Sequence, residues 1–277
     1  MALILDRVGH TYSVGTSYEE RALSGVSLAV QRGEIVLVLG STGSGKSTLL
    51  RIAAGLLPAT SGRAELDGSG LTRAMARGRV GLVFQDAESQ LFAETVAADV
   101  AFGPRNLGAT AEQAGQRVHE ALLAVGLDPA LYGGRSPFGL SGGEARRAAI
   151  AGVVAMRPAY LLLDEPTAGL DARGRDAVRS VVKAARQNAG IIVVSHSAEE
   201  FLGEADRVVV LANGETSFDG PAADLVAEPA AFSAAGLIAP DVLRTQQLAR
   251  DRGHDAGSFT LDPRVAAASL ARVGGGS

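Results

Sequence analysis

Short uninterrupted apolar runs recur along the chain and end abruptly at polar residues or glycine. Runs of this length that lack an alternating pattern are typical of strands covered on both faces of a sheet. Helical stretches such as 172–188 separate the later runs. This order predicts an α/β fold with a mainly parallel sheet covered by helices. The predicted strands are 34–39, 79–85, 160–164, 190–195 and 207–211.

Two further segments, 3–8 and 26–30, precede the parallel set and are separated by a polar loop at 13–20. Apolar segments of this kind, joined through such a loop, predict a small antiparallel β part at the N-terminus. The first parallel-type run then stops at Gly40, and 44–54 has the pattern of a helix. A strand, a glycine-rich turn and a helix in this order open an α/β unit.

Strand signals disappear between 86 and 155, where helical patterns are interrupted only by glycine and proline. We therefore expect an all-helical subdomain (86–155) inserted into an α/β core formed by 1–85 and 156–220. Turns and then short alanine-rich helices are expected after the last apolar run, so that 221–273 forms a helical C-terminal extension. The final 274–277 has the composition of a linker or tag remnant.

Composition excludes several classes of protein. The 277 residues contain no cysteine, which rules out a thiol nucleophile and a disulfide framework. With 26 basic against 30 acidic residues, the net charge of −4 argues against a dedicated nucleic-acid binder. The apolar runs are far shorter than the ~20 residues that span a bilayer, and the N-terminus lacks the order of a signal peptide. We expect a cytoplasmic protein that reaches a membrane only through a partner.

The glycine-rich turn fits the phosphate-loop pattern G-x-x-x-x-G-K-S in its required place between a strand and a helix. Glycines allow backbone N–H groups to close around phosphate oxygens, and the helix N-terminus adds partial positive charge. Lys46 is expected to bridge the β- and γ-phosphates, and the Ser47 hydroxyl to bind Mg²⁺. The residues expected to contact the nucleotide are Ser41, Thr42, Gly43, Ser44, Gly45, Lys46, Ser47 and Thr48.

Two acids lie at the end of the predicted strand 160–164: Asp164 is its last residue, and Glu165 follows directly. Ligands of open parallel sheets bind at the carboxyl ends of the strands. Asp164 is therefore the expected Mg²⁺ ligand, and Glu165 the expected general base for water attacking the γ-phosphate. The alternative is a simple helix cap, because Pro166 and Thr167 follow and acids favour helix starts.

A second helix opens with Leu140-Ser141-Gly142-Gly143-Glu144. Ser141 and Glu144 have the spacing of a capping box, which is a purely structural interpretation. The two glycines also expose backbone N–H groups to an anion, as in the phosphate loop. The chain therefore has two helix N-termini suited to anions, far apart in sequence.

This segment resembles the signature motif of ABC-transporter ATPases, in which Gln is usual at the position of Glu144. Further motifs of that family follow in the same order: Gln85 resembles the Q-loop glutamine, Asp171 ends a stretch that resembles the D-loop, and His196 follows a strand as the switch histidine does. Tyr12 lies where an adenine-stacking aromatic is expected. For Tyr12 and His196 the alternative is ordinary packing at a strand end.

The resemblance implies a P-loop NTPase fold, ATP and Mg²⁺ as ligands, and ATP hydrolysis by a head-to-tail dimer with the same or a similar chain. In such a dimer Ser141, Gly142, Gly143 and Asp171 would serve the nucleotide held by the partner's phosphate loop. His196 would contact the γ-phosphate in its own subunit. Gln85 would report on Mg²⁺ and the γ-phosphate.

The stretches 83–96 and 99–108 narrow the resemblance to the ATPase subunits of energy-coupling-factor transporters, with Ala87 where proline is usual. That implies an importer of a vitamin or transition-metal ion, with a transmembrane coupling protein and a substrate-binding membrane protein as partners, and a peripheral position on the cytoplasmic face of the membrane. Our hypothesis is that Glu88, Glu94 and Asp99 meet basic residues of the membrane partner.

The family resemblance also implies that the C-terminal extension holds two ATPase subunits together. A different class remains open: a soluble ABC-type ATPase that acts on DNA or ribosomes. Such proteins usually carry paired ATPase domains or long coiled coils, and neither occurs here. A P-loop kinase or a small GTPase would leave the signature segment and His196 unexplained.

Overall fold

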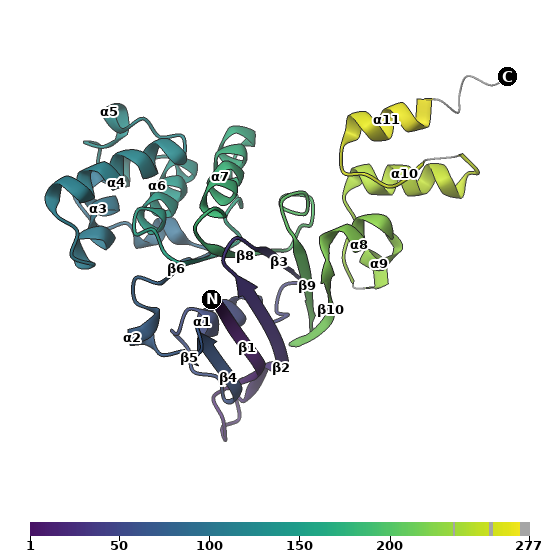
Figure 1. Ribbon diagram of the computed structural model, residues 1–277, viewed down its shortest axis with the longest axis horizontal. Helices are drawn as coiled ribbons and strands as arrows, with labels where there is room; N and C mark the ends of the chain where they lie inside the picture. Colours follow the sequence, from purple (N-terminus) through teal and green to yellow (C-terminus); the bar gives the residue numbers. More distant parts are fainter. Residues whose placement is uncertain (235, 255–256, 272–277) are drawn as a thin grey trace.

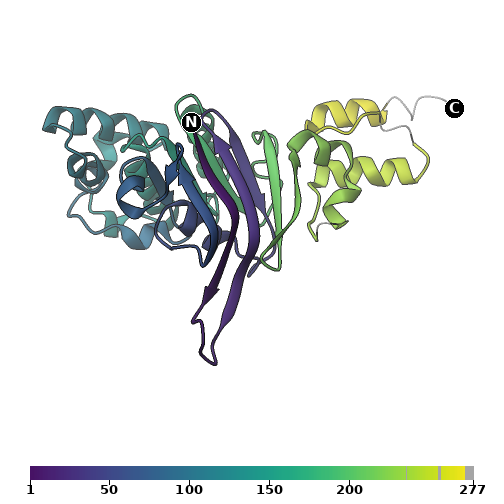
Figure 2. The same ribbon diagram turned by 60° about the horizontal axis from the view of Figure 1, so that its bottom comes forward.

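The computed structural model describes residues 1–234, 236–254 and 257–271, so the predicted linker at 274–277 lies outside the described residues. The described chain is elongated in both views (Figures 1 and 2), with the helices α3 to α6 at one end, two β-sheets in the middle and the helices α8 to α11 at the other end. The division of the chain into core, insertion and extension stays a prediction.

A six-stranded sheet forms the centre of the described chain. Five neighbouring strands are parallel, and β10 pairs antiparallel at one edge. The mainly parallel sheet predicted from the apolar runs is confirmed, and it agrees with the P-loop NTPase fold that the family resemblance implies. In spatial order the strands are β10 (Glu215–Pro221), β9 (Arg207–Ala212), β3 (Ile35–Leu39), β8 (Gly190–Ser195), β7 (Tyr160–Asp164) and β6 (Val80–Val83).

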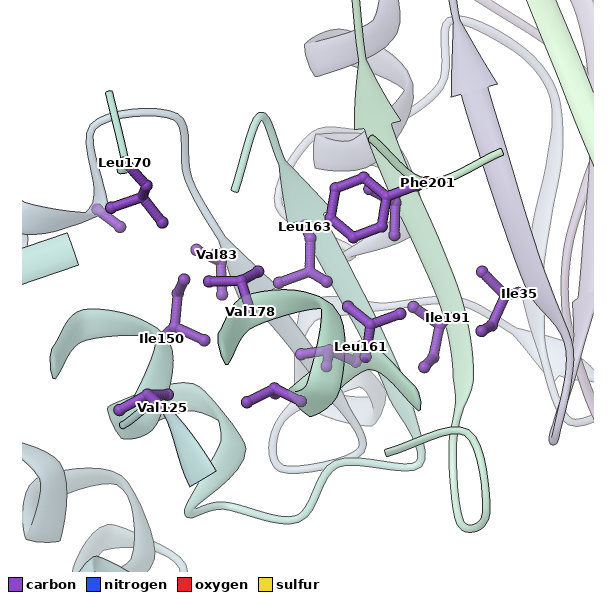
Figure 3. Close-up of a cluster of buried hydrophobic side chains, with 14 of the residues drawn as sticks. Ile35, Val83, Val125, Ile150, Leu161, Leu163, Leu170, Val178, Ile191 and Phe201 are labelled. Carbon is purple, nitrogen blue, oxygen red and sulfur yellow. The ribbon is translucent and has the colours of Figure 1, made fainter. Parts of the chain in front are cut away.

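Strands β3, β7 and β8 are buried along their whole length, which explains their uninterrupted apolar sequences. Their side chains alternate between two hydrophobic clusters. One cluster joins the sheet to the helices α6 (Gly142–Val154) and α7 (Ala172–Ala185). Figure 3 shows the sheet residues Val83 and Leu161 in this cluster together with Ile150 and Val178. The other joins the sheet to α1 (Lys46–Ala53) and the second sheet. Both faces of the parallel sheet are therefore covered.

The second sheet is antiparallel and has four strands in the described residues. Its two long strands form a hairpin that projects from the body of the molecule (Figure 2). The predicted N-terminal antiparallel part is confirmed, although two of its short strands were not predicted. In spatial order the strands are β2 (Glu20–Gln31), β1 (Ala2–Tyr12), β4 (Ser61–Leu66) and β5 (Ser69–Gly70).

The expectation of turns after the last apolar run was wrong, because β10 follows there and pairs antiparallel with β9. Most side chains of β10 and of β4 are exposed or half-buried. Such strands carry little apolar signal, and their pairing depends on a neighbouring strand that is already in place. Pro221 is tolerated because it ends an edge strand.

Helices make up the inserted segment, as its sequence predicts. Its elements are η1 (Ala87–Gln90), α3 (Val96–Asn106), α4 (Ala111–Ala124), α5 (Pro129–Tyr132), η2 (Pro137–Gly139) and α6. A further short helix, α2 (Arg73–Ala76), precedes β6.

The C-terminal helices are α8 (Ala222–Ala227), α9 (Ala230–Ala234), α10 (Asp241–Asp251) and α11 (Pro263–Ala271). Leu225, Phe232 and Leu243 of these helices are fully buried and belong to the same cluster as the inner sheet residues. The C-terminal helices therefore pack against the α/β core.

Candidate functional site

A cleft of about 430 Å³ lies where the parallel strands end. β3 leads into the phosphate loop, β7 ends at Asp164, and the residues that follow β6 and β8 complete the same edge. Most of the residues predicted for the site come together here, although they lie far apart in the sequence. The cleft is lined by Tyr12, Glu20, Ala22, Thr42, Gly43, Gly45, Lys46, Ser47, Thr48, Gln85, Asp164, Glu165 and His196.

The phosphate loop is held tightly between its neighbours, and this explains two of its glycines. Gly40 and Gly45 both have positive φ, at 154° and 98°. A Cβ at Gly40 would lie 2.4 Å from the Leu211 carbonyl oxygen, and a Cβ at Gly45 would lie 2.5 Å from that of Ala22. Only glycine fits at these points, and its use lets the loop backbone curl around an anion.

Lys46 is the first residue of α1 and is only 8% exposed. Its Nζ donates hydrogen bonds to the carbonyl oxygens of Gly40 and Ser41 at 2.7 and 2.9 Å. Burial lowers the pKa of Lys46, and the nearby carboxylates of Glu165 and Asp164 oppose that shift. The ammonium is therefore held at the mouth of the loop, where it faces two acids.

The loop fits a phosphate chain on an observation independent of the motif. The Ser44 hydroxyl is buried and has no hydrogen-bond partner among the described residues. The first turn of α1 contains no acidic residue, so the partial positive charge of the helix N-terminus is not neutralised. An anion with several acceptor oxygens would satisfy these groups. Ser41 lines a neighbouring hollow together with Gly40 and His196.

Asp164 is 7% exposed, and burial raises the pKa of its carboxyl group, while a hydrogen bond from Ser47 and the charge of Lys46 oppose the shift. A carboxylate with such an environment gains from a cation. The described residues contain no group of three or more His, Asp or Glu side chains that could hold a metal on their own. The oxygens of Ser47 and Asp164 fit Mg²⁺ only as part of a shell completed by phosphate and water, which is how this ion is usually bound.

Glu165 has an unusual backbone for its residue type, with a φ of 48°. Its N–H donates to the Val194 carbonyl oxygen at 3.0 Å, which fixes the peptide to the next strand. Its Oε2 lies 2.9 Å from His196 Nδ1. The Glu165 side chain is 12% exposed and that of His196 is 67% exposed. A left-handed conformation outside glycine costs free energy, and such strain recurs at functional sites.

Tyr12 is placed at the opposite side of the cleft by the hairpin. Its hydroxyl lies 3.1 Å from Thr48 Oγ1, and the His10 ring packs edge-on against it at 4.5 Å. Gln85 is exposed and lines the cleft just after β6. Tyr12 is therefore oriented by the helix that carries the phosphate loop.

Ser141, Gly142 and Gly143 do not line this cleft within the described chain. They begin α6, where Ser141 and Glu144 form the predicted capping box. Glu144 accepts hydrogen bonds from the N–H of Ser141 at 2.8 Å and the hydroxyl of Tyr132 at 2.8 Å. These bonds lower the pKa of Glu144 to about 2. The segment presents an exposed serine tied to a charged carboxylate.

Asp171 also lies away from the cleft. It is the N-cap of α7, where its Oδ1 accepts from the Gly174 N–H at 2.8 Å. A Cβ at Gly143 would lie 3.4 Å from Leu170, the residue before Asp171. The signature segment and the Asp171 segment are therefore neighbours on one surface, distinct from the cleft.

Two acids of the insertion have partners within the chain, and their expected contact with a membrane protein stays a prediction. Glu88 pairs with Arg146, and Asp99 accepts hydrogen bonds at 2.8 Å from the N–H groups of Phe92 and Ala93. Sequence analysis missed Arg146. The available signal was a charged residue on the same face of a helix as the buried Ile150.

The known proteins that resemble this chain agree with this geometry. The family model of the ABC transporter matches residues 23–168. The chain belongs to the ABC transporter family. It is 45% identical over 275 residues to the energy-coupling factor transporter ATP-binding protein EcfA2 of Symbiobacterium thermophilum, with 96% of this chain and 95% of the relative covered. It is therefore an ATPase of the energy-coupling factor type.

Similar solved structures are also ABC ATPases. The structure of cbiO1 from Clostridium perfringens, part of the ABC transporter complex cbiONQ, is 32% identical and superposes with a TM-score of 0.73 over 88% of this chain and 98% of that one. The dimeric post-hydrolysis structure of the ATP-binding cassette MJ0796 with ADP and Pi is 27% identical, with a TM-score of 0.72 over 79% and 98%. This ABC ATPase binds and hydrolyses ATP. No helix in the described part of the chain is long and apolar enough to cross a membrane.

Proposed function

We propose that this ATPase powers an importer of the energy-coupling factor type for a vitamin or a transition-metal ion. The observation that carries the proposal is the similarity to the EcfA2 relative, which extends beyond the nucleotide-binding motifs over 96% of the chain. The insertion and the C-terminal extension are therefore included in the similarity. The solved ABC cassette MJ0796 covers 79% of this chain, against 96% for the EcfA2 relative.

The residues that line the cleft can account for the binding of ATP and Mg²⁺. The phosphate loop would hold the triphosphate through its backbone N–H groups, and Lys46 would neutralise charge on the β- and γ-phosphates. Ser47, Asp164 and Gln85 would hold Mg²⁺, which when bound supplies positive charge to the transferring phosphoryl group. Tyr12 would stack on the adenine.

The pair Glu165 and His196 would act at the γ-phosphate. Glu165 is positioned to accept a proton from the attacking water, because its carboxylate lies inside the cleft and its backbone is fixed to β8. His196, whose Nδ1 lies 2.9 Å from Glu165 Oε2, would orient that carboxylate and contact the γ-phosphate. Both roles require the two side chains to be close, as they are here.

The surface formed by the signature segment and the neighbouring Asp171 segment supports a head-to-tail arrangement with a second ATPase subunit. Ser141 is exposed at the N-terminus of α6 and does not line the cleft in its own described chain. A partner in reversed orientation would bring its phosphate loop to Ser141, Gly142, Gly143 and Asp171. Each nucleotide would then be bound by two chains. The solved MJ0796 relative is described as a dimer.

The membrane partner would contact the segment after Gln85. Phe92 and Phe102 stack edge-on with ring centroids 4.8 Å apart, and yet they are 58% and 50% exposed. An exposed aromatic pair on one surface marks an interaction site. We place a transmembrane coupling protein here, with a substrate-binding membrane protein in the same complex, at the cytoplasmic face of the membrane. Glu94 follows Phe92 closely in the sequence, is exposed, and is one of the acids predicted to meet a basic partner residue.

Purification of the tagged chain from its native membrane tests the proposal. The expected result is a detergent-stable complex that contains at least one multi-span membrane protein, identified by mass spectrometry together with the stoichiometry of the ATPases. A Phe92→Ser and Phe102→Ser variant should lose that membrane protein and keep ATP binding. Recovery of the chain with ribosomes or DNA, without a membrane protein, would contradict the proposal and favour the soluble ABC-type ATPase.

A further inference from the structure

Arg146 is a buried cation on the signature helix α6. It is 7% exposed, in a helix whose other buried residues are Ala145, Ala148, Ile150 and Ala151. A charged side chain is almost never buried without partners, because removing it from water is costly. The hydrogen-bond partners of Arg146 therefore indicate which parts of the fold it holds together.

All five N–H donors of the guanidinium group have an acceptor. Nε donates to Glu88 Oε2 at 3.1 Å, and Nη2 donates to Glu88 Oε1 at 3.3 Å and to the Gln85 carbonyl oxygen. Nη1 donates to the carbonyl oxygens of Ala168 at 2.5 Å and Glu165 at 3.4 Å. The planar fork of an arginine is thus fully used, with nothing left for solvent.

These acceptors belong to two segments, which meet the helix of Arg146 only in the folded protein. Gln85 and Glu88 lie just after β6, in the segment that leaves the cleft toward the aromatic pair. Glu165 and Ala168 follow β7 and lead to Asp171. Arg146 itself stands one turn after Ser141 on α6. One side chain therefore joins the cleft, the segment after Gln85 and the signature helix.

We propose that Arg146 is a positioning residue for ATP hydrolysis, which fixes the backbones of Gln85 and Glu165 relative to the signature helix. This inference rests on the proposed function, because it concerns the same site. Arg146 does not line the cleft and acts only through the residues it holds. Glu88 orients Arg146, because its two carboxylate oxygens accept hydrogen bonds from Nε and Nη2 and so fix the plane of the guanidinium group.

The geometry explains why lysine would not replace this arginine. An ammonium group has three donors around one point and cannot reach two oxygens of Glu88 and three carbonyls on different sides. Arg146→Lys would keep the charge and most of the volume while it frees the Gln85 and Glu165 backbones. Because a displacement of about 1 Å can slow an enzyme by about 100-fold, small losses of positioning should be visible in turnover.

The test measures the purified transporter complex that carries Arg146→Lys. We expect kcat for ATP hydrolysis to fall about 10- to 100-fold, while the affinity for a non-hydrolysable ATP analogue and the melting temperature stay close to wild type. The matched control is Arg157→Lys, which alters a surface pair between a core residue and Glu120 of the insertion. That control should keep the wild-type kcat.

A second variant guards against a folding defect in the first. Glu88→Gln keeps the side-chain shape and should lower kcat by a smaller factor. In the double variant, Glu88→Gln should add little to the effect of Arg146→Lys, because both remove one interaction. Wild-type kcat in Arg146→Lys, independent additive effects, or a kcat loss matched by equal losses of analogue affinity and melting temperature would each overturn the inference.

The failure of this inference can be told apart from failure of the proposed function. If Glu165→Gln hydrolysed ATP normally, the role of the cleft itself would be wrong. If Glu165→Gln were inactive and Arg146→Lys normal, the cleft would stand and only the positioning role of Arg146 would be lost.

Discussion

The two helix N-termini that sequence analysis marked as anion sites are built in opposite ways. At α1 the loop is packed against neighbouring strands, its lysine is buried, and the first turn has no acid. At α6 the serine is exposed, the first turn contains Glu144, and that carboxylate already accepts the Ser141 hydroxyl at 2.9 Å. The N-terminus of α1 carries a buried lysine and no acid in its first turn, whereas that of α6 is exposed and carries a carboxylate.

The difference shows that the two N-termini cannot have the same task. The α1 site has a buried lysine, a Ser44 hydroxyl without a hydrogen-bond partner among the described residues and an unneutralised helix N-terminus, which can hold a triphosphate with the residues of one chain. The α6 site satisfies its own helix end and offers an anion little net attraction until another group brings positive charge close. A phosphate that is already held by the lysine and Mg²⁺ of a second chain would supply that condition. The comparison therefore supports a nucleotide site divided between two subunits.

The largest expected effect comes from blocking the open site. Ser141→Arg places a bulky cation where the partner's nucleotide would dock, so ATP hydrolysis by the complex should fall to the level of a protein-free control. Nucleotide binding to the phosphate loop of the same chain should remain, as measured with a fluorescent ATP analogue. Ser180→Arg, at an exposed serine of α7, is the matched control and should hydrolyse ATP normally. Loss of analogue binding in Ser141→Arg would show that the N-terminus of α6 affects the nucleotide of its own chain, and would contradict the separate tasks of the two helix ends.

The next effect tests the enclosed site. Glu165→Gln keeps the shape of the side chain but removes the proton acceptor, so hydrolysis should slow by about 10²- to 10⁴-fold, the usual contribution of a general base. ATP binding should persist, and the ATP-bound dimer should accumulate on size-exclusion chromatography. Glu112→Gln, at an exposed acid of α4, should leave the rate unchanged. Near-normal turnover in Glu165→Gln would refute the role of this carboxylate.

A smaller effect is expected when the open site loses its charge. Glu144→Gln restores the residue usual in the family and removes a negative charge beside the position of the partner's γ-phosphate. A partly exposed charge of this kind is worth about 0.5–1 kcal/mol, so half-maximal hydrolysis should need about two- to fivefold less ATP. The measurement is the ATP dependence of the initial rate. A need for more ATP in the variant would show that Glu144 assists docking instead of opposing it.

The smallest effect concerns stability in acid. Hydrogen bonds from Ser141 and Tyr132 lower the pKa of Glu144 from 4.5 to about 2. A lowered pKa stabilises the folded state above the unfolded value, and this contribution is lost as the pH falls from 4.5 through about 2. The melting temperature of wild type should thus exceed that of Glu144→Gln more at pH 6 than at pH 3. An equal difference at both values would show that the charge of Glu144 does not contribute to folding.

Sequence analysis predicted the enclosed site well because its parts are local. The phosphate loop, the two acids and the histidine each lie at or directly after the end of a strand, and parallel strands end at one edge of the sheet. Most of the residues so predicted line one cleft. The roles assigned to them remain predictions.

Pairing between distant segments could not be predicted in the same way. The contacts of Arg146 with Gln85 and Glu88 bridge about sixty positions of sequence and depend on how the insertion packs on the core. The strands β4 and β10 were missed because their side chains are mostly exposed and their partners, β1 and β9, decide where they form. The pairing of Glu88 with Arg146 was missed for the same reason, since Arg146 is buried on another helix.

The divided nucleotide site is the central claim, and one measurement tests it most directly: the distance from Ser141 Oγ to the nearest γ-phosphate oxygen in the Glu165→Gln complex trapped with ATP and Mg²⁺. The predicted result is a hydrogen-bond distance of about 2.7 Å, to a nucleotide held by the phosphate loop of the other subunit. A structure in which ATP contacts only the chain that carries its phosphate loop, with Ser141 facing solvent, would contradict the account.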